Sequence, residues 1–230
     1  MEIEEMAVRD AYRIRPRIHG DERGAFFESF RDREFTRVTG HVFRPVQTNF
    51  SVNHRAVLRG MHGVSLPPGQ AKYVTCVRGA VLDIVLDVRV GSPTFGAHDV
   101  NLLEPGKGTA VFLPDGMAHG FISLTQDSCV SYVFDTPYVP GTPFELNPFD
   151  PDLALPWALT EEPVVAEKDL RAPGLSRAAE LGILPRYEDC LAHYARQRTA
   201  LPSESASESA SESASEFTSE FTSEFAGEKE

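Results

Sequence analysis

Residues 72–88 of the chain read KYVTCVRGAVLDIVLDV, and this stretch decides the fold class. Its first part is rich in β-branched residues, Gly79 interrupts it, and a second apolar run resumes at Val81. Asp83 and Asp87 interrupt that second run, as expected for a strand with two unlike faces. The stretch therefore predicts two β-strands separated by a glycine.

The β pattern extends to both sides, over residues 45–135. Short apolar runs alternate with Gly, Pro and Asp turn signals about every ten residues, which is typical of a sandwich or barrel. The pattern indicates an all-β domain. The strands expected from it are Lys72–Val77, Val81–Val88, Val100–Leu103, Thr109–Leu113, Gly120–Leu124 and Cys129–Phe134.

Helical signals come only near the end of the chain. One helix is expected over residues 176–184, with Ser176 as N-cap and Gly182 near its end, and a second over residues 187–198. No composition shift divides the chain before residue 202. We therefore expect one domain, residues 1–201, with short C-terminal helices.

Residues 202–230 differ sharply in composition, because they repeat four-residue units such as SESA and SEFT. Such a segment cannot bury enough apolar surface to offset its ordering entropy, so a disordered acidic tail is expected. A partner motif built on Phe217, Phe221 and Phe225 is the alternative. Eight Glu and one Lys give residues 203–230 a charge of −7 out of the −12 of the chain. The remaining −5 is only mildly acidic and argues against nucleic-acid binding, which needs a basic face.

The cysteines Cys76, Cys129 and Cys190 are far apart and form no CxxC pair. This spacing favours reduced thiols in a cytoplasmic protein. No run approaches eighteen apolar residues, and the first residues are acidic where a signal peptide is basic. We therefore expect a cytosolic protein without a membrane segment.

Three basic side chains precede the strand that begins at Lys72. Arg59 and His62 lie in the sequence LRGMH, and Lys72 closes the sequence PPGQAK. Arg can bind a phosphate with two parallel hydrogen bonds, His can accept a proton, and Lys can stabilise the negative charge that results. The cluster predicts a site for an anionic substrate that loses a proton.

The spacing of Gly108, Pro114, Gly116 and His119 is similar to the second motif of the cupin fold. The first cupin motif needs a His-x-His pair, and this chain has only His62 there. We therefore expect a cupin-like jelly roll without a metal ion. A metal held by His62, His119 and a distant carboxylate is the alternative.

Several motifs in order resemble one family, the 3,5-epimerases that act on dTDP-4-keto-6-deoxyhexoses in rhamnose and antibiotic deoxysugar pathways. They are spread over about residues 20–185, most of the chain before the tail. The matching blocks are DERGAFFE (21–28), VQTN (46–49), LRGMH (58–62), QAK (70–72), DVRVGSPTFG (87–96), PDGMAHGF (114–121), Tyr132, Tyr138, Asp150-Pro151 and Glu167-Lys168-Asp169.

The resemblance implies a role for each matched residue. His62 corresponds to the base that removes a proton next to the C4 ketone, and Asp169 to the carboxylate that orients it. Tyr132 corresponds to the acid on the opposite face, and Lys72 to the group that stabilises the enolate. The implied substrate contacts are Arg59 and His119 at the diphosphate, Arg23, Phe26, Glu28, Gln47 and Asn49 at the nucleotide or sugar, and Tyr138 at the wall of the pocket.

The resemblance also implies an enzyme without a cofactor that works as a homodimer, in which some contacts come from the neighbouring subunit. The chain departs from the family pattern at Gly63, usually a bulky residue, at Ser65, usually Gln, and over residues 139–145. These departures leave open whether C3 alone or both C3 and C5 are inverted. Two further alternatives are a sugar-nucleotide 3,4-ketoisomerase and a non-catalytic cupin that binds a nucleotide sugar or a partner.

Overall fold

A computed structural model describes residues 1–199 of the chain. The predicted tail, residues 202–230, lies outside these described residues. The strands are β1 (Glu2–Glu5), β2 (Tyr12–Arg15), β3 (His19–Asp21), β4 (Gly24–Phe26), β5 (Gln47–Asn53), β6 (Val57–Val64), β7 (Lys72–Arg78), β8 (Val81–Asp87), β9 (His98–Leu103), β10 (Ala110–Leu113), β11 (Met117–Ser123), β12 (Ser128–Phe134), β13 (Pro143–Glu145) and β14 (Val164–Val165). The helices are α1 (Asp32–Thr39), the short 3-10 helix η1 (Pro105–Lys107), α2 (Glu167–Leu170), α3 (Leu175–Glu180) and α4 (Tyr187–Thr199).

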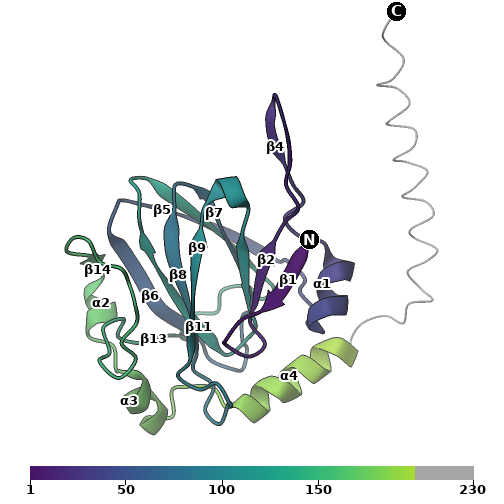
Figure 1. Cartoon of the computed structure of the whole chain (residues 1–230). Coiled ribbons are helices and arrows are strands. Elements are labelled where there is room, and N and C mark those ends of the chain that lie inside the picture. The colour runs from purple at the N-terminus through teal and green to yellow at the C-terminus, as the bar shows by residue number, and fades with distance from the viewer. Residues whose placement is uncertain (200–230) are drawn as a thin grey trace, which may run out of the picture.

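Two large sheets form the body of the protein, as Figure 1 shows. One has the order β1-β2-β10-β7-β12-β5, and the other the order β13-β6-β11-β8-β9, with β14 beside β6. Apolar side chains from both sheets meet in one core, for example Val74 and Val130 from the first sheet and Val85 and Phe121 from the second. The predicted all-β class is confirmed, and the two strands around Gly79 are found as β7 and β8.

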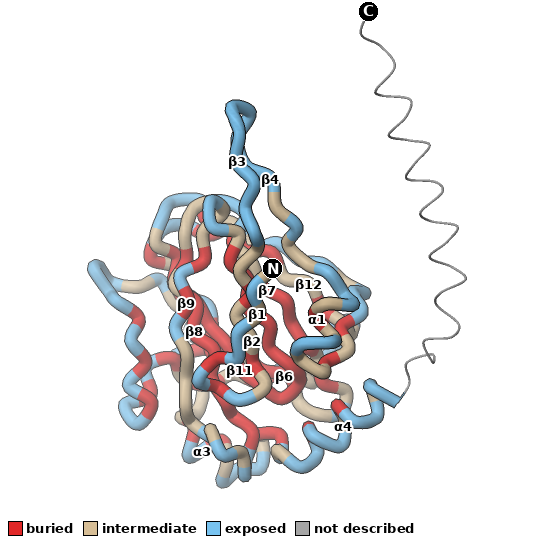
Figure 2. The backbone as a smooth tube through the Cα atoms, turned by 45° about the vertical axis from the view of Figure 1, so that its right-hand side comes forward, coloured by how far each residue is buried: buried red, intermediate tan, exposed pale blue. Residues whose placement is uncertain are grey.

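Strands β3 and β4 form a hairpin that leaves the body of the molecule (Figure 1). Figure 2 shows it as an exposed segment above the buried strands. All residues of the two strands are exposed, and Phe26 keeps 75% of its surface accessible. Phe26 is therefore not part of the core of its own chain.

Strand β6 carries one extra residue relative to its neighbour β11. His62 is opposite His119, but Arg59 is opposite Phe121, so three steps on β6 match two on β11. Gly60 sits at this β-bulge with φ 126°, and a Cβ there would lie 2.9 Å from the carbonyl oxygen of His119. The extra residue shifts the alternation of side chains, so that Arg59 and His62 face the same side of the sheet.

Helix α1 was not predicted, since helical signals were expected only near the end of the chain. It contains a single buried residue, Phe35, which packs edge-on against Phe112 at a ring distance of 4.7 Å. Its other apolar residue, Val38, is 42% exposed, and two apolar residues in eight are too few for a helical period. The four strands before residue 45 were also missed, because they are only three or four residues long.

The N-cap predicted at Ser176 is wrong. Helix α3 begins at Leu175 with Gly174 as its N-cap, and it ends at Glu180 rather than at Leu184. The backbone N–H of Leu175 donates to the Asp150 carboxylate at 2.7 Å, so a distant side chain caps the helix. Helix α4 lies close to its predicted bounds.

Together, α2 and α3 cover the outer face of the sheet that contains β6 (Figure 1). Leu175 and Ala178 of α3 pack there with Leu58, Met61 and Trp157. No helix within residues 1–199 is long and apolar enough to cross a membrane. All three cysteines carry free thiols.

Candidate active site

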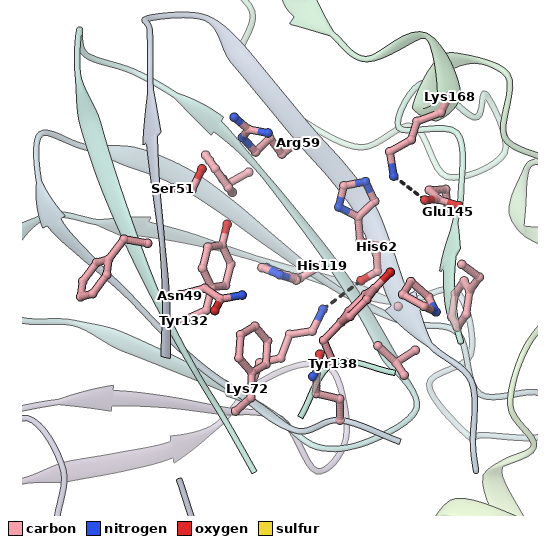
Figure 3. Close-up of a pocket in the computed structure, with 18 of the residues that line it drawn as sticks. Asn49, Ser51, Arg59, His62, Lys72, His119, Tyr132, Tyr138, Glu145 and Lys168 are labelled. Atoms are coloured by element: carbon pink, nitrogen blue, oxygen red, sulfur yellow. Dashed lines mark hydrogen bonds and ion pairs between the residues drawn. The ribbon is translucent and has the colours of Figure 1, made fainter. Parts of the chain in front are cut away.

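A cavity of about 650 Å³ opens between the two sheets. Strands β5, β7 and β12 of one sheet and β6, β11 and β13 of the other supply most of its walls, as Figure 3 shows. Its polar and charged lining residues are Asn49, Ser51, Arg59, His62, Gln70, Lys72, His119, Tyr132, Tyr138, Glu145 and Lys168. Most of the residues predicted as catalytic or substrate-binding are therefore brought together in one place.

His62 and Asp169 form a hydrogen-bonded pair at 2.9 Å between Nε2 and Oδ1. The His62 side chain is one third exposed to the cavity, whereas only 2% of the Asp169 side chain is accessible. Burial raises the pKa of Asp169, but the hydrogen bond from His62 and the charge of Lys168 outweigh it and leave the pKa below its usual value. An ionised carboxylate at this position fixes the tautomer and the orientation of His62.

Tyr132 reaches the cavity from β12, on the sheet opposite to that of His62 (Figure 3). Burial, and then the charge of Asp83, raise the pKa of Tyr132 well above its usual value. The phenol therefore stays protonated at any working pH. A protonated phenol opposite a basic imidazole is the arrangement needed to remove a proton from one face of a carbon and return one to the other.

Lys72 lies at the start of β7 with only 8% of its surface accessible. Its Nζ donates to the carbonyl oxygen of His62 at 3.3 Å, next to the base. Burial lowers the pKa of Lys72 from 10.5 to about 8, although nearby Asp83 acts in the opposite direction. The ammonium is thus poorly solvated and available to an oxygen that becomes negative during the reaction.

The pKa of Lys72 predicts a loss of activity in alkali. The lysine is charged below about pH 8 and neutral above it, so kcat/KM, which reports the free enzyme, should fall as the pH rises through 8. Replacing Lys72 by Arg should lower the maximum but remove this alkaline limb, because an arginine stays charged. A wild-type profile that is flat to pH 10, or an unchanged limb in the Lys72→Arg variant, would contradict this role.

His119 is buried beside Lys72, and its Nδ1 lies 3.0 Å from Oδ2 of Asp83. Burial and then the charge of Lys72 lower the pKa of His119, so the imidazole is neutral. Asp83 fixes its orientation, which leaves Nε2 as the atom free to meet a ligand. The burial of this ring and the adjacent Lys72 ammonium disfavour a proton on it, which suits a contact to substrate better than proton transfer.

Arg59 supplies a positive charge near the rim of the cavity. Its Nε donates to the amide oxygen of Asn53 at 2.7 Å. Within residues 1–199 no carboxylate forms an ion pair with Arg59, so its charge remains available to an anionic ligand. This position agrees with the predicted contact to a diphosphate.

Gln47 does not line the cavity but holds two residues that do. Its Nε2 donates to Oδ1 of Asn49 at 3.0 Å, and its Oε1 accepts the backbone N–H of Tyr138 at 2.9 Å. Gln47 therefore positions the loop that carries Tyr138, and its predicted contact to the nucleotide or sugar stays a prediction.

Three further predicted contact residues are absent from this cavity. Arg23, Phe26 and Glu28 lie in or just after the β3–β4 hairpin, all exposed. Arg23 pairs with Asp21 in the turn of the hairpin, and Glu28 pairs with Arg31. The structure therefore does not bring them to His62 within one chain.

Three residues near the base were not predicted. Asp83 holds His119, while Glu145 and Lys168 line the cavity and form an ion pair with each other. Figure 3 shows this pair beside His62. Asp83 had a signal, a carboxylate in an apolar strand, but Glu145 lies in the region that departs from the family pattern.

The departures at Gly63 and Ser65 have a common structural partner. Gly63 faces Phe144 of β13, and the backbone N–H of Ser65 donates to the carbonyl oxygen of Thr142 at 2.9 Å. Both residues thus contact the other departing segment, residues 139–145.

Within residues 1–199 no group of three or more His, Cys, Asp or Glu side chains is arranged to hold a metal ion. The ammonium of Lys72 would also repel a cation bound to His62 or His119. Metal independence is still a prediction.

Prolonged EDTA treatment tests this prediction, and turnover should survive it. A stoichiometric metal ion whose removal stops turnover would instead favour a metal held by His62, His119 and a distant carboxylate.

Known proteins have a similar sequence and fold. Residues 5–177 match the family described as dTDP-4-dehydrorhamnose 3,5-epimerase. The chain belongs to this family. A dTDP-4-dehydro-6-deoxyglucose 3-epimerase of Streptomyces bikiniensis is 43% identical over 183 residues, which cover 80% of this chain and 93% of the relative.

Two further comparisons agree with the first. A dTDP-4-dehydrorhamnose 3,5-epimerase of Mycolicibacterium smegmatis is 42% identical over 203 residues, 88% of this chain and all of the relative. The crystal structure of a 3'-monoepimerase from Streptomyces bikiniensis in complex with dTDP-quinovose superposes with a TM-score of 0.81 at 42% identity, covering 85% of this chain and 98% of that one.

Membership of this epimerase family confirms the predicted cupin-like fold and the predicted enzyme class, an isomerase that acts as a deoxysugar epimerase. The ketoisomerase and the non-catalytic cupin are not favoured by these relatives. The relatives include both 3-epimerases and 3,5-epimerases, so family membership leaves the number of inverted carbons open.

Proposed function

We propose that residues 1–201 form an epimerase of a dTDP-4-keto-6-deoxyhexose that inverts C3 first and C5 to a lesser extent. The observation that carries the proposal is the pairing of His62 with Asp169 on one sheet, opposite the protonated phenol of Tyr132 on the other. A cytoplasmic location stays a prediction.

The chemistry follows from these groups. The C4 ketone acidifies the hydrogens on C3 and C5, and His62 takes one of them as a proton. The electron pair of the broken C–H bond moves to the C4 oxygen and forms an enolate, which the Lys72 ammonium stabilises. Tyr132 then gives its proton to the opposite face of the same carbon, so that the configuration inverts while the ketone remains at C4.

The anionic half of the substrate fits the rest of the cavity. Arg59 offers a charge that is not paired with a carboxylate, and neutral His119 offers a ring nitrogen held by Asp83. Arg59 suits a diphosphate, because charge-assisted hydrogen bonds to phosphate are among the stronger ones in proteins. The free Nε2 of neutral His119 accepts a hydrogen bond and therefore suits a hydroxyl group of the substrate.

Incubation in D2O with dTDP-4-keto-6-deoxyglucose tests the proposed function. An epimerase incorporates deuterium at C3, at C5 or at both, and the carbonyl stays at C4 in the NMR spectrum of the product. A ketoisomerase moves the carbonyl to C3. A binding protein exchanges nothing, and either of these last two results would overturn the proposal.

We further propose that the protein is a homodimer in which the β3–β4 hairpin of each chain completes the cavity of the other. The hairpin leaves its own body (Figure 1), and part of the cavity wall is β5, an edge strand. Phe50 and Val52 on that strand line the cavity and are 64% and 58% exposed. Exposed apolar residues on an edge strand favour an interface with a second copy.

The shared cavity predicts complementation between two inactive variants. Arg23→Ala and His62→Asn should each lose most of the turnover when prepared alone. Dimers formed from a mixture of the two should recover about a quarter of the wild-type rate, because half of the dimers are mixed and each mixed dimer has one intact cavity. The measurement is turnover after unfolding and refolding the two chains together. No recovery, or full activity of Arg23→Ala alone, would contradict the shared site.

A further inference from the structure

The ring of Phe144 occupies the space where a side chain of residue 63 would lie. Strand β13 pairs with β6 so that Phe144 is opposite Gly63. A Cβ on Gly63 would be 2.6 Å and 2.8 Å from Cε2 and Cε1 of the ring, and closer still to Cζ. The φ of Gly63 is not in the left-handed region, so its backbone does not require a glycine. The ring of Phe144 is what leaves no room for a larger residue at position 63.

The ring of Phe144, packed against Gly63, fixes β13, the strand that lies beside His62. Met61 and Leu146 exchange both backbone hydrogen bonds, at 3.1 Å and 2.9 Å. In an antiparallel pair such positions alternate with positions that lack these bonds and whose side chains lie closer together. His62 and Glu145, the next pair in the register, are such a position, so the Glu145 carboxylate stands beside the base.

Glu145 in turn holds Lys168. The two side chains form an ion pair, in which Lys168 is 62% and Glu145 31% exposed. An ion pair this exposed contributes little to its own position. The Nζ of Lys168 is also 3.8 Å from Oδ1 of Asp169, the partner of His62. Phe144, only 5% exposed, is the buried residue next to Glu145 that can hold the exposed Glu145–Lys168 pair in place.

We propose that Phe144, seated on Gly63, is a positioning residue that fixes the Glu145–Lys168 pair beside His62 and thereby favours proton exchange at C3 over C5. This inference rests on the proposed epimerase function. C3 and C5 lie on either side of C4, so a single base reaches both only if the sugar ring moves within the cavity. A fixed wall next to His62 limits that movement, and small displacements of reacting groups change rates strongly.

The test is the ratio of the initial rates of deuterium incorporation at C5 and C3, measured by NMR in D2O. Phe144→Leu should raise this ratio about tenfold, because the rate at C3 should fall while the rate at C5 stays the same or rises. Gly63→Ala should act in the same direction, because the added methyl group displaces the ring from the other side. An unchanged or lower ratio in these variants would overturn the inference.

Two controls separate positioning from general stability. Phe43→Leu removes the same atoms from another buried phenylalanine that does not line the cavity, and it should leave the ratio unchanged. The double variant Gly63→Phe/Phe144→Ala supplies the ring from β6 and should return the ratio to within about twofold of the wild type. Failure of this rescue would also overturn the inference. A wild type that incorporates no deuterium would instead refute the epimerase function itself.

Discussion

Replacing His62 by Asn should abolish deuterium exchange at every carbon of the sugar. Asn retains a polar group that can reach Asp169, but it cannot accept a proton from carbon at neutral pH. The other imidazole that lines the cavity, His119, is held by Asp83 at its Nδ1 and lies beside the Lys72 ammonium, which disfavours a proton there. Loss of the base should lower the exchange rate by about 10²–10⁴-fold or more.

The control for this variant is His54→Asn. The His54 side chain is 81% exposed, and it is not a lining residue of the cavity. Exchange should continue at the wild-type rate in this control, and dTDP should bind to both variants with similar affinity. If His62→Asn exchanges at the wild-type rate at either carbon, the base assigned to the reaction is wrong.

Replacing Asp169 by Asn should lower kcat by roughly 10²–10³-fold with a smaller effect on KM. The amide is neutral, so it does not stabilise the imidazolium that forms when His62 takes the proton. An Asn side chain can also donate a hydrogen bond to Nε2, which favours the wrong tautomer for the reaction. Substrate contacts are left in place, because Asp169 is buried behind His62 rather than in the cavity wall.

A neighbour in the same helix is the matched control. Glu167 of α2 is exposed and pairs with Arg171, so Glu167→Gln removes a carboxylate from the same helix without touching His62. This control should keep nearly all of the wild-type kcat. An equal loss in both variants, or a loss of Asp169→Asn that appears mainly in KM, would show that the carboxylate supports the fold or binding rather than the base.

The strands of the core could be predicted because local pattern decides them. Residues 72–88 alternate or cluster apolar side chains in a way that only a sheet can bury, and they form β7 and β8. Helix α1 could not be predicted in this way, since a single residue, Phe35, holds it to the body. The exact ends of α3 depend on Asp150, a residue 25 positions away in sequence.

In the candidate site too, some features could be predicted from local sequence and others could not. His62, Lys72, His119 and Tyr132 were predicted from motifs and lie in one cavity. Periodicity alone would have placed Arg59 and His62 on opposite faces of β6, and the bulge at Gly60 reverses this. The motifs carried that information, whereas the alternation of residues did not.

Other parts of the site depend on contacts that the motifs do not contain. Glu145 and Lys168 meet across a loop, and Phe144 meets Gly63 only through the pairing of two strands. The hairpin of Arg23 and Phe26 was matched by its motif, but the motif did not show that this hairpin projects away from the cavity of its own chain. Such information comes from the path of the backbone rather than from any single block of sequence.

The most direct test of the central claim is the time course of deuterium uptake by wild-type enzyme in D2O. The pairing of His62 with Asp169 opposite Tyr132 predicts that a hydrogen next to C4 exchanges, that the configuration of its carbon inverts, and that the carbonyl remains at C4. The wall formed by Phe144 on Gly63 predicts that this exchange occurs first at C3. Exchange at C5 should follow more slowly. Uptake at C5 alone, a carbonyl that moves to C3, or no uptake at all would contradict the account.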